Sequence, residues 1–417
     1  MIAEILATGE EIRSGALIDS NSSHIAQKLE EAGIRVVRHT CVGDDLNALV
    51  SILNEIAKRS DLAVVTGGLG PTADDMTAEA VAKAAVVNLV FDPLALKSVE
   101  AFFAARNRKM TDINRKQAML PEGSKCLSNP VGTAPGFCLT INQCLFFFLP
   151  GVPHEMRQML ATSVLPDIFK LLGKNRNFYR VTTISTFGLT ESLTAERLYG
   201  FESAFANIKL GLRAKFPEIQ IKLYASGLNE DDLSARLADA TRWVVEKIGN
   251  HVFSENGDPM EKVIGGLLRK RNETLAVAES CTGGLISDMI TDVPGSSDYF
   301  VFSGITYSNQ AKEEILRVSS STIKKYGAVH EQTAKEMAEG VRRICGATYG
   351  LSTSGIAGPD GATQDKPVGT VCIGLASPHG ATGHRFSFSN YNRLMNKQIF
   401  SMMALDTLRR KLVKASS

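Results

Sequence analysis

Ser280 stands where a nucleophile would be exposed. It follows a predicted buried strand, 275–278, and lies in the run Ala278-Glu279-Ser280-Cys281-Thr282-Gly283-Gly284, which leads into a predicted helix at 284–290. A serine in such a turn lies at the carboxyl edge of a sheet. The backbone amides of Thr282, Gly283 and Gly284 beside it offer an oxyanion hole or a cradle for an anion. This setting is typical of acyl transfer, for which the hydroxyl needs a base.

The candidate base is Lys312, which comes shortly after a predicted strand that ends at Tyr307. No histidine occupies a comparable loop, because His330 stands at a predicted helix start and His379 in a Pro-Gly turn. A lysine whose pKa is lowered by burial acts as a general base, and Tyr307 relays the proton or positions the substrate. We therefore expect the Ser280 hydroxyl and the Lys312 amine to meet across a cleft. In the competing interpretation Ser280 caps a helix, Lys312 is solvated and Tyr307 belongs to the core, which is the commoner outcome for these residue types.

A second polar loop follows the predicted strand at 349–353. Its run Thr353-Ser354-Gly355-Ile356-Ala357-Gly358-Pro359-Asp360-Gly361 is able to receive a phosphate on backbone amides. Arg393 begins the last predicted helix, and a guanidinium suits a phosphate or a carboxylate, although a single arginine is more often a surface charge. Cys281 has no histidine partner and is interpreted as a small packed hydrophobe. The substrate-binding candidates of this half are therefore Thr282, Gly283, Gly284, Ser354, Gly355, Ala357, Gly358 and Arg393.

The N-terminal third carries a glycine-rich loop of its own. A buried strand runs into Gly67, Gly68 and Gly70, whose missing Cβ atoms let backbone amides approach an anion, and the helix that follows offers its N-terminus to the same anion. Asp74 and Asp75 are compatible with a phosphate when a divalent cation such as Mg²⁺ bridges them. In the alternative interpretation one of these aspartates only caps the helix, and the glycines alone do not decide.

Three more loops are expected at the same edge of that sheet: 8–11, 129–136 and 150–155. Ligands of open α/β sheets bind beyond the carboxyl ends of the strands. Convergence of the loops therefore predicts a pocket for a nucleotide or a pterin-like molecule, without showing a reaction there.

The elements that would position these residues alternate between strand and helix, which predicts parallel sheets wrapped by helices. The predicted fold class is α/β, with two three-layer α/β domains whose sheets are mainly parallel. They span 1–170 and 258–415 and are joined by a small α+β middle module at 178–255, for which a spacer or dimerising role is the default. Residues 173–177 are expected to form a linker. The strands expected are 2–7, 34–38, 61–65, 145–148, 180–187, 219–225, 275–278, 300–307, 349–353 and 368–375, and the helices are 21–32, 46–59, 191–199, 231–248, 261–269, 284–290, 332–344 and 394–412.

Composition narrows the class of protein. At about 100–200 residues per domain, a chain of 417 residues predicts two or three domains. A net charge of +2 argues against direct binding of nucleic acid, and the longest apolar runs are too short to span a membrane. The seven cysteines are scattered and show no C-x-x-C spacing, which predicts a reduced, cytoplasmic chain.

The first domain resembles the molybdopterin-binding-like domain of the CinA family of competence/damage-inducible proteins, through the loops above together with Gly15 and Asn21. The resemblance implies a divalent metal and ADP-ribose pyrophosphatase activity, as in some members of the family. It assigns Asp74 and Asp75 to the metal. The nucleotide-binding residues that it implies are Glu11, Asn21, Gly67, Gly68, Gly70, Thr72, Lys116 and Asn129.

The last domain is similar to the CinA C-terminal domain, which occurs alone as a nicotinamide mononucleotide deamidase. The similarity rests on 278–284, Pro294-Gly295-Ser296-Ser297, Tyr307-Ser308-Asn309 with Lys312, Gly355–Pro359 and Lys366-Pro367-Val368-Gly369-Thr370. It implies Ser280 as nucleophile, Lys312 as base, Tyr307 as helper, and hydrolysis of the carboxamide to acid and ammonia without a metal. Loop 354–361 and Arg393 would hold the ribose phosphate.

Four positions depart from the family pattern in the last domain. Ser354 replaces the usual Thr, His330 replaces the usual Ser ahead of a helix, Tyr391-Asn392 replaces the usual Gly-Asp, and Lys397 replaces the usual second Arg. The last two changes touch the expected substrate-binding segment. The first hypothesis is thus a homodimeric enzyme that acts on nicotinamide mononucleotide and ADP-ribose. A non-catalytic nucleotide-sensing or interaction protein, or a pterin-binding N-terminal domain, are the alternatives.

Overall fold

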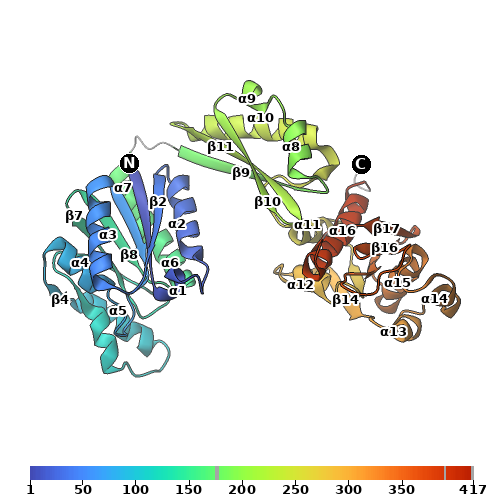
Figure 1. Cartoon of the computed structure of the whole chain (residues 1–417), viewed down its shortest axis with the longest axis horizontal. Coiled ribbons are helices and arrows are strands. Elements are labelled where there is room, and N and C mark those ends of the chain that lie inside the picture. Colours follow the sequence, from blue (N-terminus) through green and yellow to red (C-terminus); the bar gives the residue numbers. More distant parts are fainter. Residues whose placement is uncertain (174–177, 389–390, 415–417) are drawn as a thin grey trace. The chain divides into compact units, whose positions relative to one another are not determined.

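The computed structural model describes residues 1–173, 178–388 and 391–414 (Figure 1). They divide into two compact units. The first contains Met1–Arg180 with Ala225–Ser234, and the second contains Val181–Tyr224 with Ala235–Ser417. Each unit is described by itself.

The first unit is built on a six-stranded sheet in the order β2-β1-β3-β8-β7-β6. Neighbours from β2 to β8 pair in parallel, whereas β7 pairs antiparallel with both β8 and β6. The sheet strands are β1 (Ile2–Thr8), β2 (Arg35–Val42), β3 (Leu62–Thr66), β6 (Lys125–Leu127), β7 (Gly136–Ile141) and β8 (Cys144–Leu149), and a separate pair is formed by β4 (Leu89–Phe91) and β5 (Met119–Pro121).

Helices cover both faces of this sheet. Leu49 and Leu53 of α3 pack with Val65 of β3 on one face, while Ile25 of α2 packs with Val64 on the other. Adjacent residues of β3 therefore serve opposite layers, as the pleat of a strand requires. The helices are α1 (Glu10–Arg13), α2 (Ser20–Glu31), α3 (Leu46–Arg59), α4 (Thr77–Ala85), α5 (Pro93–Ala104), α6 (Pro153–Met159) and α7 (Leu165–Leu172), with a 3₁₀ segment at Asp112–Ala118 and a π segment at Leu160–Val164.

The middle of the chain forms a four-stranded sheet in the order β10-β11-β9-β12. Its strands are β9 (Phe178–Phe187), β10 (Ile208–Lys215), β11 (Glu218–Gly227) and β12 (Val252–Ser254). The helices around it are α8 (Glu191–Arg197), α9 (Phe201–Ala204) and α10 (Glu230–Ile248), followed by a 3₁₀ turn at Gly249–His251. The expected strands and helices of this module are present, and β10, β12 and α9 are additions to them.

The C-terminal part is a five-stranded sheet in the order β14-β13-β15-β16-β17. Strand β13 pairs in parallel with β14 and β15, and the other two pairings are antiparallel. The strands are β13 (Leu275–Glu279), β14 (Phe300–Ile305), β15 (Tyr349–Gly355), β16 (Thr370–Ser377) and β17 (Gly380–Ser387). The helices are α11 (Met260–Arg271), α12 (Leu285–Thr291), α13 (Asn309–Glu314), α14 (Ser320–Tyr326), α15 (Glu331–Cys345) and α16 (Arg393–Lys414), with a 3₁₀ turn at Ser296–Asp298.

Two layers of helices enclose this sheet as well. Val277 of β13 packs with Ile264 of α11 and Phe400 of α16, whereas Ala278 packs with Met337 of α15. The α/β class with mixed, partly parallel sheets is confirmed. Strand β14 ends at Ile305, so Tyr307 lies in the loop after it and not in the strand as expected. Residues 174–177 of the expected linker lie outside the described part of the chain.

All seven cysteines are free thiols, as the scattered spacing predicts. Among the described residues, no helix combines the length and the apolar character that a membrane span requires.

Candidate active sites

Ser280 is the first residue after β13, and the neighbouring Glu279 fixes the turn in which it stands. The Glu279 side chain is fully buried and accepts from the backbone amides of Gly284 (2.9 Å), Ile286 (3.2 Å) and Ser287 (2.9 Å), and from the Ser287 hydroxyl at 2.6 Å. It thus satisfies amides at the start of α12 that would otherwise lack partners. This role of Glu279 was not predicted, because in the sequence the residue is only one member of the motif around Ser280.

The expected contact between Ser280 and Lys312 is present. The Lys312 Nζ lies 3.1 Å from the Ser280 Oγ, 2.8 Å from the carbonyl oxygen of Thr306 and 3.1 Å from that of Tyr307. The Lys312 side chain is 1% exposed and Ser280 is 8% exposed. The solvated-lysine interpretation is therefore wrong.

Burial lowers the pKa of Lys312 to about 8. A neutral amine has two N–H bonds and one lone pair. The two carbonyl oxygens are acceptors only, so they match the two N–H bonds, and the lone pair is left for the Ser280 hydroxyl proton. Three partners and a low pKa together suit a general base.

Tyr307 contributes to this centre through its backbone. Its side chain is 61% exposed, and its hydroxyl accepts from Arg393 at 3.3 Å, while its carbonyl oxygen contacts Lys312. Because Lys312 touches Ser280 directly, no relay is needed between them, and of the two expected roles for Tyr307 the geometry favours positioning. Arg393 also donates to the Gly358 carbonyl oxygen at 2.6 Å, so it links the Tyr307 segment to the loop after β15.

Several other expected binding groups are engaged within the chain. The Gly283 amide donates to the Ser280 carbonyl oxygen, and the Gly284 amide donates to Glu279. These two amides were expected to bind an oxyanion, but both already have a partner within the chain. The Thr282 hydroxyl is buried against the Thr353 hydroxyl at 2.8 Å. The carboxyl-edge turn is present, but its donors are fewer than the sequence indicated.

The glycine-rich run 353–361 begins later than expected. Ser354 and Gly355 belong to strand β15 and pair with Cys372 and Val371 of β16, and the Ser354 hydroxyl donates to the Ala328 carbonyl oxygen at 2.8 Å. The Ala357 carbonyl oxygen accepts from the buried Asn396 at 3.1 Å. Sheet pairing, burial and its own hydrogen bond therefore engage Ser354, whereas Gly355 is paired in the sheet but only half-buried, and phosphate binding at these two residues stays a prediction.

Three remaining residues have clear places. Burial raises the pKa of the Cys281 thiol to about 12, which fits a packed hydrophobe and not a nucleophile. His330 caps α15, since its Nδ1 accepts from the Gln332 amide at 3.0 Å. Lys397 points toward the Ser280 turn: a Cβ added at Gly283 would lie 3.5 Å from the Lys397 Nζ. The Lys397 amine thus lies beside Gly283, in the turn that follows the candidate nucleophile.

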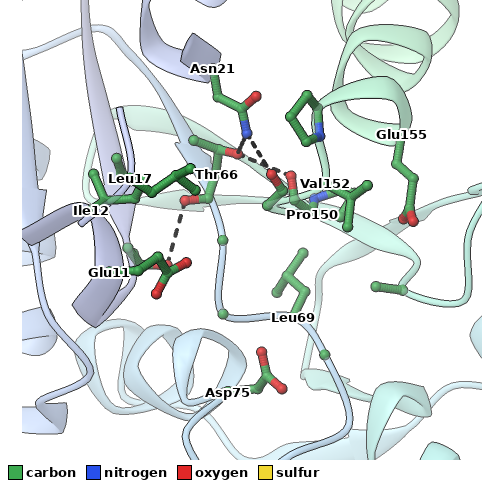
Figure 2. A pocket seen from close by; sticks show the side chains of 18 of the residues that line it. Glu11, Ile12, Leu17, Asn21, Thr66, Leu69, Asp75, Pro150, Val152 and Glu155 are labelled. Carbon is green, nitrogen blue, oxygen red and sulfur yellow. Dashed lines mark hydrogen bonds between the residues drawn. The ribbon is translucent and has the colours of Figure 1, made fainter. Parts of the chain in front are cut away.

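The first unit holds a cavity of about 480 Å³ at the carboxyl edge of β1, β3 and β8, within the size range of roughly 300–1,000 Å³ of small-molecule pockets (Figure 2). The loops expected at this edge, 8–11, 129–136 and 150–155, all contribute residues to its lining. Figure 2 shows Glu11, Asp75 and Glu155 around the same space, each from a different segment. The Asn21 amide holds two of the segments together by donating to the Thr66 hydroxyl (3.1 Å) and the Gly151 carbonyl oxygen (2.7 Å).

Of the residues expected here, Glu11, Asn21, Gly67, Gly68, Gly70 and Asp75 line this cavity. Gly68 has φ +65°, and a Cβ there would overlap the Thr77 hydroxyl, so the backbone course requires glycine. The Thr72 amide (2.9 Å) and hydroxyl (2.5 Å) both donate to the Asp75 carboxylate. Thr72 therefore acts on Asp75 and does not line the cavity.

Three expected N-terminal residues lie elsewhere. Asn129 is 1% exposed and braces its own loop, because it donates to the Ala134 carbonyl oxygen (2.9 Å) and to Glu155 (2.7 Å). Lys116 lines a smaller neighbouring cavity of about 70 Å³ and donates to the Thr72 carbonyl oxygen. Asp74 is exposed and is not part of the lining. Glu155 lines the cavity and was not predicted as a site residue, although the loop that carries it was expected at this edge.

The metal expected at Asp74 and Asp75 fits this edge only in part. Nowhere in the described ranges do three or more His, Cys, Asp or Glu side chains gather so as to hold a metal ion. Negative charge does accumulate there: burial raises the pKa of Asp44, and the carboxylates of Glu11, Asp74 and Asp75 raise it further. Since Mg²⁺ binds through one or two carboxylates, waters and substrate phosphates, Asp75 suits a metal that arrives with a phosphate.

Comparison with known proteins covers nearly the whole chain. Three family profiles match: "Probable molybdopterin binding domain" over residues 4–170, "Damage-inducible protein CinA KH domain" over 181–254, and "CinA C-terminal domain" over 257–412. A CinA-like protein of Desulfosudis oleivorans is 54% identical over 413 residues, which is 99% of this chain and 100% of the relative. A CinA-like protein of Desulforapulum autotrophicum is 46% identical over 417 residues, with 99% of each chain covered.

Solved structures match parts of the chain. The protein CinA of Thermoplasma acidophilum, described as of unknown function, is 34% identical, covers 40% of this chain and 99% of its own, and has a TM-score of 0.38. The competence/damage inducible protein CihA of Agrobacterium tumefaciens is 32% identical over 37% of this chain and 93% of its own, with a TM-score of 0.36.

Proposed function

The chain belongs to the CinA family, and on that premise we propose that its C-terminal domain is an amidohydrolase that converts nicotinamide mononucleotide to nicotinate mononucleotide and ammonia. The observation that carries the proposal is the 3.1 Å contact between the Ser280 hydroxyl and the buried Lys312 amine. A serine with a base of low pKa is the minimum that covalent amide hydrolysis requires.

The reaction follows from this pair. The Ser280 Oγ attacks the carboxamide carbon while its proton passes to the neutral Lys312 amine. The tetrahedral adduct collapses, the C–N bond breaks, and Lys312 returns the proton to the departing nitrogen, so that ammonia leaves and an ester of Ser280 remains. Water then attacks the ester with Lys312 again taking its proton, and return of that proton to Ser280 releases the acid. No metal or cofactor takes part in this proposal.

Arg393 would hold the phosphate of the substrate. It begins α16, donates to the Gly358 carbonyl oxygen and contacts the Tyr307 hydroxyl, so its guanidinium is held between the Tyr307 segment and the loop after β15. A fixed, planar guanidinium presents paired donors that match a phosphate. Lys397 and the Ala357–Gly358 backbone complete the proposed binding segment.

The test is ammonia release from nicotinamide mononucleotide by the purified full-length protein. The expected result is turnover that Ser280→Ala abolishes. The unfolding temperature should change little, because the substitution removes a single hydroxyl group. Cys281→Ala is the matched control, since it deletes the adjacent thiol and should leave turnover in place. No ammonia from a folded wild-type protein would reject the proposal, and equal loss in the two variants would point to packing.

For the N-terminal domain we propose hydrolysis of the pyrophosphate of ADP-ribose with a divalent metal. The observation that favours it is the cavity of about 480 Å³, which combines a glycine-rich loop with the Asp75 carboxylate. When bound, the metal would offset charge on the phosphoryl oxygens. Asp75 would hold it, Thr72 orients Asp75 by two hydrogen bonds, and the Gly67–Gly70 backbone would bind phosphate.

The rival proposals differ in what they predict. A nucleotide-sensing protein would bind nicotinamide mononucleotide without releasing ammonia, and a pterin-binding N-terminal domain would retain molybdopterin in place of ADP-ribose. A cytoplasmic homodimer remains part of our proposal, whereas a nucleic-acid partner does not. Residues 181–254 contain no G-x-x-G sequence, the loop with which KH domains clamp nucleic-acid backbones.

A further inference from the structure

The second unit contains a cavity of about 490 Å³ that shares no lining residue with either candidate active site. Its walls come from the end of β9, the turn before β12, strands β16 and β17, and the last turns of α16. The lining residues are Phe187, Gly188, His251, Leu375, Thr382, His384, Phe386, Met403, Asp406, Thr407, Arg410, Lys411 and Lys414.

One part of this lining is apolar. Phe187 and Leu375 are almost fully buried, and Phe386 and Met403 are half-buried against the same core. A ring or branched chain placed on these side chains would be removed from water, and burial of its apolar surface would favour binding. His251 closes one end, with its Nδ1 donating to the Phe187 carbonyl oxygen at 3.0 Å.

The other part is cationic, and its centre is Arg410. The carboxylate of Asp406 is buried and accepts from the Nε of Arg409 at 2.8 Å and from the Nε of Arg410 at 2.6 Å. Arg409 uses its terminal nitrogens on the carbonyl oxygens of Val252 (3.1 Å) and Asn250 (2.8 Å). Arg410 also lines the cavity, and within the described part of the chain its hydrogen bond to Asp406 is made through Nε, which leaves the four N–H bonds of its terminal nitrogens for a ligand.

The charges around this cavity do not cancel. Arg410, Lys411 and Lys414 line the cavity with one carboxylate, that of Asp406, which also binds the neighbouring Arg409, although the whole chain carries a net charge of only +2. An anchored guanidinium with uncompensated positive charge beside it is a receptor for a carboxylate or a phosphate. The apolar part of the lining next to Arg410 requires that the ligand also carry an apolar group.

We propose that this cavity is a binding site for an organic anion: a phosphate or carboxylate held by Arg410 and Lys411, on an aromatic or branched apolar body that lies against Phe187, Leu375 and Phe386. A purely ionic ligand would leave the apolar side chains uncovered, and a purely apolar ligand would leave the cationic side chains unpaired. A ligand with an anionic group and an apolar body contacts both parts of the lining. The site is independent of the proposed hydrolase activities, since it shares no residue with them.

The test compares two fluorescent probes of almost the same shape on the full-length protein. The anion 8-anilinonaphthalene-1-sulfonate should bind in one equivalent, and Arg410→Gln should weaken it by on the order of tenfold, as loss of a charge-assisted hydrogen bond does. The uncharged N-phenyl-1-naphthylamine should bind wild type and Arg410→Gln alike. Lys270→Gln, the same loss of charge at an exposed site in the same unit, is the control and should bind both probes like wild type.

A second variant, Thr382→Trp, tests the site independently in case Arg410→Gln does not fold. Thr382 is exposed at the rim on β17, so Thr382→Trp should fold, fill the mouth and reduce binding of both probes. Displacement of the sulfonate by phenyl phosphate but not benzoate would assign a phosphate ligand, and the reverse a carboxylate. The proposal is overturned if Arg410→Gln and Thr382→Trp bind the sulfonate as wild type does, or if neither competitor displaces it.

Discussion

The rate of amide hydrolysis should follow the neutral form of Lys312. Burial lowers the pKa of this amine from an ordinary value of 10.5 to about 8, so about a tenth of the molecules carry the neutral base at pH 7. We expect kcat/KM for nicotinamide mononucleotide to rise about tenfold per pH unit below pH 8 and to level off above it. A profile that is flat between pH 6 and 9, or that rises only near pH 10.5, would refute the assignment of Lys312 as the base.

Two substitutions of Lys312 distinguish its role as a base from the effect of its positive charge. Lys312→Arg keeps a cation that stays protonated at every accessible pH, and Lys312→Met removes the amine, so both should lose about 10²–10⁴-fold in kcat/KM and the pH-dependent rise with it. The exposed Lys324→Met is the matched control and should follow the wild-type profile. Retention of the rise in Lys312→Met would show that another group titrates.

The same pKa also predicts a stability change, with a defined sign. Below about pH 8 the lysine is protonated in both folded and unfolded chains. Between pH 8 and 10.5 the folded chain has released the proton and the unfolded chain still binds it, so stability rises with pH. The free energy of unfolding of wild type should therefore gain roughly 3 kcal/mol over that of Lys312→Met across this range. A difference between the two proteins that stays constant with pH would contradict a buried, neutral lysine.

Further predictions concern binding and the N-terminal domain. Arg393→Gln should raise KM for nicotinamide mononucleotide by on the order of tenfold with little change in kcat, because one phosphate contact is lost; a fall in kcat alone would speak against phosphate binding. Chelation by EDTA, or Asp75→Asn, should abolish release of AMP from ADP-ribose and leave ammonia release intact, and both reactions are followed in one tube. Gly68→Ala should lose ADP-ribose binding measured by calorimetry, whereas Gly123→Ala, which has the same sign of φ but open space, should cost only about 1 kcal/mol of stability.

Local sequence patterns were sufficient for elements whose signals are strong. Helix α3 has the bounds expected from the sequence, and its local signals are strong: Asp45 caps it, accepting from the Ala48 amide at 2.8 Å, and apolar residues recur at helical spacing. Strand β17 was missed because Gly380–Ser387 alternates half-buried and exposed positions and offers no apolar run. An edge strand of this kind is specified by its pairing with β16 and not by its own residues.

Site residues were harder to predict, since the partner of a polar side chain is decided by tertiary structure. Asn129 and Ser354 look like binding residues in a sequence, yet each is about 1% exposed and bonded to its own chain. Burial had the opposite consequence for Lys312, where it lowers the pKa and favours the chemistry. Residue type alone cannot separate these outcomes. Burial keeps a polar side chain such as that of Asn129 bonded within the chain, whereas it lowers the pKa of the Lys312 amine and makes it a base.

The reactive pair is set by the register of two parallel strands. Glu279 of β13 lies opposite Ile305 of β14, and the Thr306 amide donates to the Glu279 carbonyl oxygen at 2.9 Å, so Ser280 and Thr306 leave the sheet side by side. Thr306 then supplies a carbonyl oxygen to Lys312, which completes the contact with Ser280. A slip of one residue would turn the side chains after β14 to the other face of the sheet and move the amine away from the hydroxyl. The thirty-two positions that separate the two residues in sequence are therefore bridged by backbone pairing, while burial supplies the reactivity.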